Sequence, residues 1–303
     1  MIEAKNLIKK YGDKLAVNDL SFKVETGKVT GFLGPNGAGK STTMRLMVGL
    51  DNGGGHTTYD GKVLDTYKQP SKMVGILLEA KAFHPTRTAR NHLSVLAAQG
   101  GMAQSRVNEV LDIVGLASEA TGKPGKFSLG MSQRLGIAAA LLGEPKYLIL
   151  DEPSNGLDPE GIAWLRQFIR DYAKEGRGVL ISSHLLSEMS QLADNVVVVG
   201  KGQLITATSM DHLIEGSGVS VFVRSTTQAG LEKILRAAKL NFKKKDDGLL
   251  VSVSKTDVVG QLAHSKNIVL LELSPHMASL EQAFLELTEG KAEYEASTKD
   301  VRK

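Results

Sequence analysis

A glycine-rich stretch at residues 34–42 limits the folds open to this chain more than any other feature. It reads Gly-Pro-Asn-Gly-Ala-Gly-Lys-Ser-Thr and fits the pattern G-x-x-x-x-G-K-[ST]. An apolar run, Val29–Leu33, comes directly before it, and a helical pattern, Lys40–Gly49, overlaps its end. A strand that leads into a helix through such a loop is typical of α/β proteins with a largely parallel sheet.

The loop predicts a cradle for phosphate groups. Its glycines let the backbone curl until several N–H groups point inward, and the helix N-terminus adds a partial positive charge. We expect Lys40 to reach the β- and γ-phosphates of a nucleotide and the Ser41 hydroxyl to bind Mg²⁺. An ordinary glycine-rich turn is the alternative interpretation. The other loop residues expected around the phosphates are Gly34, Pro35, Asn36, Gly37, Ala38, Gly39 and Thr42.

Two carboxylates follow a second apolar run. Tyr147-Leu-Ile-Leu is followed directly by Asp151 and Glu152. An acidic residue at a strand end beside a phosphate loop holds Mg²⁺, directly or through water, and this role suits Asp151. Glu152 would then lie near the γ-phosphate, where it can orient or deprotonate an attacking water. The alternative is a solvated turn, because Asp-Glu-Pro is also good loop chemistry.

Alternating strand and helix patterns continue to about residue 210, and the order and spacing of the predicted elements then change. We expect an α/β domain at 1–214, a small α+β domain at 215–290 and a disordered tail at 291–303, which lacks periodicity. The strands expected after the loop are Tyr147–Leu150, Val179–Ser182, Val196–Val199, 219–223, 249–253 and 268–273. The helices expected are 128–142, Ile162–Tyr172, 184–192, 231–240, 256–264 and 280–287, with helical periodicity also from about 88 to 116.

Composition excludes several classes of protein. There is no cysteine, so disulfides and thiolate metal sites are excluded. No apolar run approaches the ~20 residues of a membrane-spanning helix, and the N-terminus has no signal-peptide core. The net charge of +4 is mild and includes no dense basic block of the kind that binds nucleic acid. We therefore expect a cytoplasmic protein.

In order and spacing, these motifs resemble the ATP-binding cassette (ABC) superfamily over about residues 1–210. Residues 34–42 resemble the Walker A loop, and 147–152 the Walker B strand with its catalytic glutamate. Ser154-Asn-Gly-Leu-Asp158 is similar to the D-loop, in which Asp158 is the acidic residue. The resemblance implies a P-loop NTPase of the ABC nucleotide-binding type, with a helical subdomain at about 86–142.

The resemblance also implies roles for residues that patterns alone do not mark. His184 looks like the histidine that contacts the γ-phosphate, and Tyr11 like the aromatic residue that stacks on adenine, with Val17 packed near the same base. Phe127-Ser-Leu-Gly-Met-Ser-Gln-Arg looks like the signature segment, in which Ser128 and Gly130 contact the ATP of a partner chain. This segment departs from the usual LSGGQ because Leu129 and Met131 replace Gly and Gln.

A second departure is Glu79, which stands where the family carries a glutamine that touches Mg²⁺ and senses the membrane subunit. We expect Glu79 to be a metal-side or coupling residue, or else a solvated glutamate at a strand end. Residues 83–90, the signature segment and residues 279–288 are similar to ATPases of bacitracin- and lantibiotic-type exporters. That similarity implies export of a drug, a peptide or a lipid-like compound.

The leading hypothesis is therefore the ATPase subunit of a transporter, peripheral on the inner face of the cell membrane. It would dimerise on MgATP, expected with an identical copy, and power a separate membrane permease. The second hypothesis is a non-transport ABC ATPase acting on DNA or ribosomes, but such proteins carry paired cassettes, coiled-coil insertions or zinc sites. The third is a binding module without hydrolysis, against which the presence of both Glu152 and His184 argues.

Overall fold

The computed structural model describes residues 1–216, 219–253 and 256–277. These residues form two compact units, one of Met1–Thr208 and one that begins at Ser209. The observed division therefore falls six residues before the start of the expected second domain. The helix predicted at 280–287 and the tail at 291–303 lie outside the described residues.

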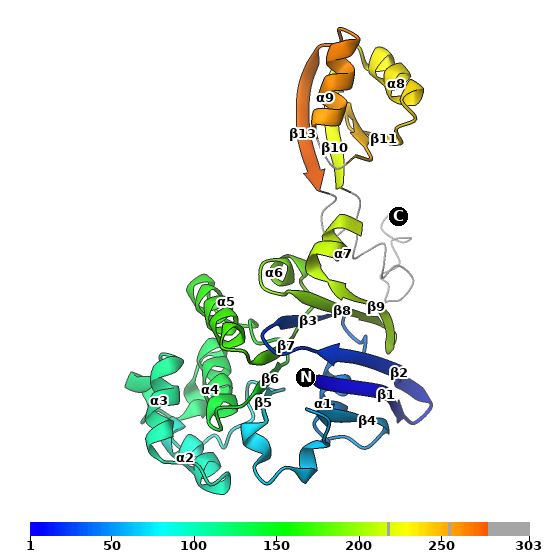
Figure 1. The fold of residues 1–303 in the computed structure, drawn as a ribbon. Helices are drawn as coiled ribbons and strands as arrows, with labels where there is room; N and C mark the ends of the chain where they lie inside the picture. Colours follow the sequence, from blue (N-terminus) through cyan, green and yellow to red (C-terminus); the bar gives the residue numbers. More distant parts are fainter. Residues whose placement is uncertain (217–218, 254–255, 278–303) are drawn as a thin grey trace, which may run out of the picture. The chain divides into compact units, whose positions relative to one another are not determined.

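A six-stranded sheet forms the centre of the first unit (Figure 1), with strand order β5-β6-β7-β3-β8-β9. Neighbouring strands from β5 to β8 run parallel. β3 pairs Leu33 with Ser183 of β7, and β6 pairs Leu150 with Ile181 of β7, so these three strands end at one edge of the sheet. The strands are β3 (Val29–Leu33), β5 (Val74–Leu77), β6 (Tyr147–Leu150), β7 (Gly178–Ser183), β8 (Asn195–Gly200) and β9 (Gln203–Ser209).

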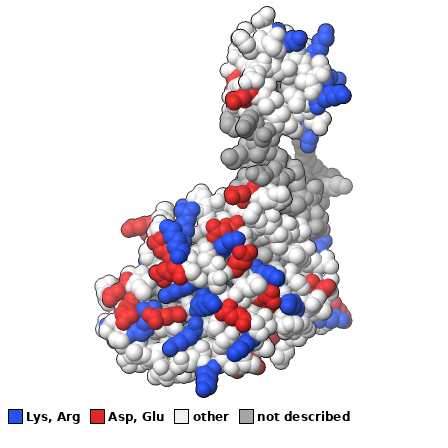
Figure 2. Space-filling view, in the orientation of Figure 1, with Lys and Arg blue, Asp and Glu red and all other residues white. Residues whose placement is uncertain are grey.

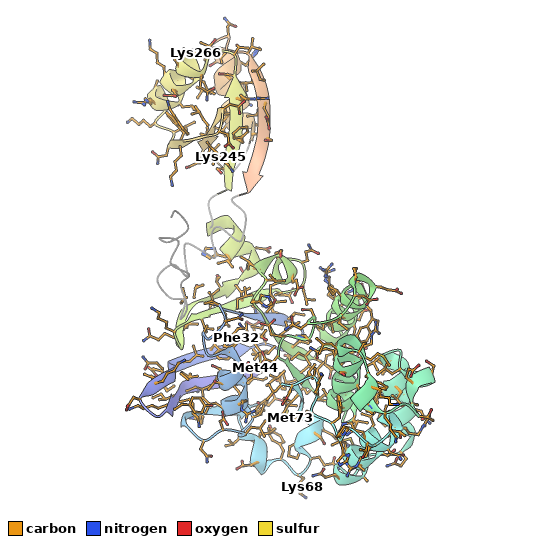
Figure 3. The ribbon with its side chains drawn as sticks, turned by 180° about the vertical axis from the view of Figure 1, so that it is seen from behind. Phe32, Met44, Lys68, Met73, Lys245 and Lys266 are labelled. Carbon is orange, nitrogen blue, oxygen red and sulfur yellow. The ribbon has the colours of Figure 1, made fainter. Side chains whose placement is uncertain are left out.

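A smaller antiparallel sheet, in the order β2-β1-β4, shares one core with the central sheet and with helix α1. Phe32 of β3 and Met44 of α1 are both fully buried in this core, and Met73 packs against it (Figure 3). The core therefore fixes the strand and the helix on either side of the phosphate loop. The elements are β1 (Ile2–Tyr11), β2 (Lys14–Val24), β4 (Gly54–Tyr59) and α1 (Lys40–Met47).

Helices α2, α3 and α4 pack on one another, and α4 also contacts β5. They cover much of the helical subdomain expected at 86–142. Ser128 accepts a hydrogen bond from the Met131 N–H at the start of α4, and Asp158 caps α5, whose first residue is Pro159. The helices are α2 (Ala89–Gln99), α3 (Ser105–Ile113), α4 (Leu129–Leu141), α5 (Pro159–Lys174) and α6 (Leu186–Ser190), with short 3₁₀ turns η1 (Leu64–Thr66), η2 (Pro70–Lys72), η3 (Ala117–Glu119) and η4 (Pro124–Lys126).

The second unit has its own sheet, in the order β11-β12-β10-β13, with antiparallel neighbours. Together with α8 and α9 this makes the βαββαβ arrangement of ferredoxin-like domains. Its core contains Val221, Val223, Leu231, Leu249 and Val259. The elements are α7 (Met210–Gly216), β10 (Val219–Ser225), α8 (Gln228–Ala237), β11 (Phe242–Lys245), β12 (Gly248–Val251), α9 (Thr256–Ser265) and β13 (Leu270–Met277).

Acidic and basic side chains are interspersed on the face of the first unit that Figure 2 shows. None of the described helices is both long and apolar enough to cross a membrane.

Candidate active site

The phosphate loop joins β3 to α1, and packing requires its glycines. Gly37 and Gly39 have φ angles of 82° and 97°, a region that other residues rarely adopt. A Cβ atom at Gly39 would lie 2.5 Å from the Ala16 carbonyl oxygen, and one at Gly34 would lie 2.5 Å from the Val199 carbonyl oxygen. The surrounding backbone therefore excludes side chains at these positions. The loop borders a cavity of about 340 Å³ lined by Tyr11, Lys14, Ala16, Asn36, Gly37, Ala38, Gly39, Lys40, Ser41, Thr42 and Glu152.

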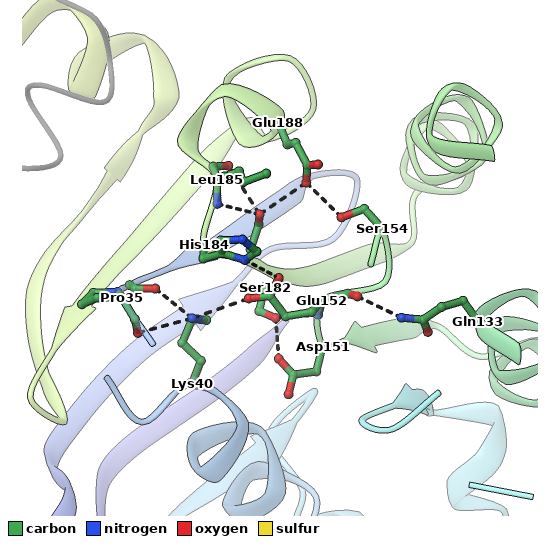
Figure 4. Close-up of polar contacts among 12 residues, drawn as sticks. Pro35, Lys40, Gln133, Asp151, Glu152, Ser154, Ser182, His184, Leu185 and Glu188 are labelled. Atoms are coloured by element: carbon green, nitrogen blue, oxygen red, sulfur yellow. Dashed lines mark hydrogen bonds and ion pairs between the residues drawn. The ribbon is translucent and has the colours of Figure 1, made fainter. Parts of the chain in front are cut away.

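Lys40 lies inside this cradle with 7% of its side chain exposed. Its Nζ donates a hydrogen bond to the Gly34 carbonyl oxygen at 2.8 Å and lies 3.5 Å from the Pro35 carbonyl oxygen (Figure 4). The same Nζ is 3.6 Å from Oε1 of Glu152. A phosphate entering the cradle would meet this ammonium group directly, and the contact with Glu152 would be exchanged for one with the nucleotide.

Glu152 has a strained backbone that side chains from two other elements hold. Its φ angle is 47°, in the left-handed region that is uncommon for residues other than glycine. Its N–H donates to Oγ of Ser182 at 2.8 Å, and its carbonyl oxygen accepts from Nε2 of Gln133 at 3.1 Å. On the side chain, Oε2 lies 2.9 Å from Nδ1 of His184. The carboxylate is thus placed between Lys40 and His184 (Figure 4).

Asp151 is 9% exposed and comes directly after β6. The Ser182 hydroxyl donates to Oδ1 of Asp151 while it accepts from the Glu152 N–H, so one β7 side chain orders both acidic residues. Oxygen donors of this type suit Mg²⁺, as does the Ser41 hydroxyl in the cavity wall. The described residues contain no group of three or more His, Cys, Asp or Glu able to hold a metal. Binding of Mg²⁺ by Ser41 and Asp151 stays a prediction.

Tyr11 lines the same cavity, and its ring is held in place from two sides. The hydroxyl donates to Oδ2 of Asp51 at 2.7 Å, and this hydrogen bond raises the pKa of Tyr11. Nζ of Lys9 lies 4.9 Å from the ring centroid. Val17, by contrast, is fully buried in the core and is not part of the cavity wall, so its place near the base stays a prediction.

Ser128 and Gly130 do not line the cavity of their own chain. Ser128 caps α4, but its hydroxyl hydrogen can still be donated to an anion. A Cβ atom at Gly130 would lie 2.8 Å from the Gly156 carbonyl oxygen, and Leu129 packs against Gly156. The start of α4 therefore contacts the segment that leads to Asp158, whose carboxylate accepts from the Gly161 N–H at 2.9 Å.

Glu79 is exposed and lies outside the phosphate cavity. It lines a second hollow of about 630 Å³, whose wall includes Phe83, Leu96, Met102 and Leu135. His92, also in this wall, is buried, and that burial lowers its pKa. Glu79 is therefore not among the residues that line the phosphate cavity, and its role toward the metal stays a prediction.

Sequence reasoning missed Ser182 and Gln133. Ser182 was recognised only as part of a strand, although a serine beside the ends of β3 and β6 is a signal that could have been used. Gln133 is 4% exposed on α4, and no local pattern links it to Glu152. Trp164 stacks on Phe168 with ring centroids 5.7 Å apart and lies against the Arg134 guanidinium.

Comparisons with known proteins agree with this site. Residues 17–155 match the family model described as ABC transporter, and residues 219–281 match a model described as a domain of unknown function. The bacitracin transport ATP-binding protein BcrA of Bacillus licheniformis is 43% identical, over 70% of this chain and 71% of its own length. The lantibiotic transport ATP-binding protein SrtF of Streptococcus pyogenes is 37% identical, over 70% of this chain and 92% of its own.

A solved structure described as the ATP-binding subunit of an ABC transporter is similar at a TM-score of 0.65 and 27% identity. It covers 71% of this chain and 92% of its own. These matches confirm the fold class and the similarity to bacitracin- and lantibiotic-type ATPases that the sequence predicted.

Proposed function

This chain belongs to the ABC transporter family of ATP-binding proteins, and we propose that it is the ATPase subunit that powers a separate membrane permease for the export of a peptide or drug. The observation that supports the proposal is that the Glu152 carboxylate contacts both Lys40 of the phosphate loop and His184. The similarity to transport proteins for bacitracin and lantibiotics supports the class of cargo.

Hydrolysis at this site would need positioning and charge neutralisation rather than a covalent intermediate. Lys40 would neutralise charge on the β- and γ-phosphate oxygens. The Glu152 carboxylate would accept the proton of the attacking water as its oxygen bonds to the γ-phosphorus and ADP leaves. His184, 2.9 Å from Glu152, would orient that carboxylate and contact the γ-phosphate. Mg²⁺ held by Ser41 and Asp151 would supply further charge neutralisation.

A head-to-tail dimer would complete each ATP site. Ser128 and Gly130 lie at the start of α4, away from the cavity of their own chain, so they can serve a nucleotide bound to a second copy. The helix N-terminus there favours an anion. Two copies would close on two MgATP molecules, with each site combining the loop of one chain and the signature segment of the other.

The hollow around Glu79 is the surface we assign to the permease. Its wall is largely apolar, and Glu79 adds a carboxylate to it that a partner segment would meet. Replacing Glu79 by glutamine should change the ATPase rate or its coupling to transport. Unchanged Mg²⁺ dependence, ATPase rate and transport would remove Glu79 from both roles.

The direct test is ATP hydrolysis by the purified chain, alone and with a candidate membrane permease. Wild-type protein should release phosphate from ATP, and Lys40→Ala should abolish this. Cells that express both subunits should survive bacitracin better than cells that carry Lys40→Ala. Wild-type turnover by Lys40→Ala would refute the assignment of the cradle. Salt-sensitive binding to nucleic acid would instead favour a non-transport ATPase, for which the mixed charges in Figure 2 offer little support.

A further inference from the structure

The turn that follows β6 contains Glu152 and is called the catalytic turn below. Its main chain is held by a residue of α4, the helix that begins within the signature segment of the same chain. Gln133 lies on α4, five residues after Ser128, and its Nε2 donates to the Glu152 carbonyl oxygen at 3.1 Å (Figure 4). The side chain is buried, with 4% exposed, so water does not compete freely for this bond. Such a bond fixes the position of the Glu152 peptide relative to α4.

The turn needs holding because its backbone is strained. A glutamate with a φ angle of 47° occupies a sparsely populated region of backbone conformation, which costs free energy. The Ser182 hydroxyl holds the N–H side of this residue and Gln133 holds the carbonyl side. The Asn155 N–H also reaches the Glu152 carbonyl oxygen, at 3.2 Å. Loss of Gln133 therefore leaves no unsatisfied carbonyl but frees the turn to move.

We propose that Gln133 is a positioning residue that aims the Glu152 carboxylate, and through it links the two ATP sites of the dimer. The proposal rests on the proposed function, because the signature segment serves the partner's ATP while Glu152 serves the ATP of its own chain. A second contact joins the same elements, since Leu129 packs against Gly156 four residues after Glu152. A shift of α4 at one site would thus be transmitted to the glutamate of the other.

The first experiment compares Gln133→Met with Gln167→Met in the full-length protein. Methionine keeps the length of the side chain but donates no hydrogen bond. Gln167 is a matched control because its Nε2 also donates a hydrogen bond, to Oδ2 of Asp171 on the exposed face of α5. Gln133→Met should lower kcat about 10- to 100-fold with KM for ATP unchanged, because displacement of a catalytic group acts on the chemical step. Gln167→Met should retain the wild-type rate.

Mixed dimers then decide through which site Gln133 acts. The reference dimer pairs a wild-type chain with a Glu152→Gln chain, so that hydrolysis depends on one glutamate. Placing Gln133→Met in the chain that keeps Glu152 should slow hydrolysis at least tenfold relative to this reference. Placing it in the chain that carries Glu152→Gln should leave the rate equal to the reference, because the signature segment itself is intact.

Three outcomes would overturn the proposal. Gln133→Met could retain the wild-type kcat, or it could raise KM without lowering kcat. In the mixed dimers, hydrolysis could be slow only when Gln133→Met and Glu152→Gln are in the same chain. If Gln133→Met lowers the melting temperature so far that the protein is unfolded, Gln133→Asn replaces it, because its amide is one methylene too short to reach the carbonyl. The same loss of kcat is expected, and a wild-type kcat would equally refute the role. Absence of ATPase activity in the wild-type protein would count against the proposed function instead.

Discussion

Replacing Glu152 by glutamine isolates the charge of the catalytic carboxylate. Glutamine preserves the length of the side chain and leaves the main-chain bonds to Ser182 and Gln133 in place. It removes the group that would accept the proton of water. A general base contributes a factor of about 10²–10⁴, so we expect kcat to fall by that factor, equivalent to about 3–5 kcal/mol in the barrier.

The same substitution should strengthen ATP binding. Oε1 of Glu152 lies 3.6 Å from Nζ of Lys40, and a bound ATP would have to displace this contact. With an effective dielectric constant of about 20, the attraction over that distance has a ceiling of about 5 kcal/mol. Most of it is offset by desolvation. We expect a net gain of about 1 kcal/mol, or about fivefold tighter ATP binding.

Two measurements check this prediction. Phosphate release gives kcat, and gel filtration with ATP or with ADP shows whether Glu152→Gln accumulates as a dimer only with ATP. Glu175→Gln is the matched control, because Glu175 is an exposed carboxylate at the far end of α5. Hydrolysis by Glu152→Gln at the wild-type rate would refute the role of Glu152 as the base. Weaker ATP binding in this variant would refute the inference that the contact with Lys40 opposes the nucleotide.

Three further predictions concern other parts of the first unit. Tyr11→Ala should weaken ATP binding about tenfold without changing kcat at saturation, since stacking of an aromatic ring on a base contributes about 1–3 kcal/mol. Tyr11→Phe keeps the ring and should lose less ATP affinity in an equilibrium binding measurement. Equal losses of affinity in the two variants would exclude stacking. Burial alone would raise the pKa of Asp60, but hydrogen bonds from Lys146, the N-terminal amine and Tyr147 lower it well below its usual value. The stability that these bonds add is present above about pH 4 and is lost as the pH falls toward the lowered pKa. In urea unfolding at pH 7, the free energy of unfolding of Asp60→Asn should therefore be lower than that of the wild type, by on the order of 1 kcal/mol, and the difference should narrow below pH 4. A difference that does not depend on pH would contradict this. Trp164 is the single tryptophan, and its ring centroid lies 4.6 Å from the Arg134 guanidinium of α4. MgATP should therefore change the tryptophan fluorescence of the wild-type protein but not that of Lys40→Ala. An identical change in both proteins would show that the fluorescence does not report nucleotide binding.

Local sequence patterns predicted the elements whose residues are consecutive in the sequence and have a distinctive composition. The phosphate loop was readable because its glycines and lysine are consecutive, and β6 because its four residues are all apolar. β4 was missed because Gly54–Tyr59 has two glycines and little apolar alternation; pairing with β1 makes it a strand, with Ile2 opposite Tyr59.

The arrangement around the catalytic turn depends on tertiary packing and was less accessible. Asp151, Glu152 and His184 could be chosen by motif, but nothing local states that Ser182 bridges the two acidic residues. The bond from Gln133 joins residues 19 positions apart that meet only because α4 packs beside the central sheet. The helix observed here, α6 (Leu186–Ser190), is also shorter than the predicted helix at 184–192. His184 therefore lies in the loop before α6, where its ring contacts Glu152.

The ferredoxin-like sheet of the second unit has two edges that are poor templates for an added strand. β11 presents Lys243, Lys244 and Lys245, all exposed, along one edge. β13 forms the other edge and contains Pro275, which has no N–H to donate. Charge repulsion and a missing donor guard such a sheet against edge-to-edge aggregation. A protein that docks on this unit would therefore have to approach a face of the sheet or its helices.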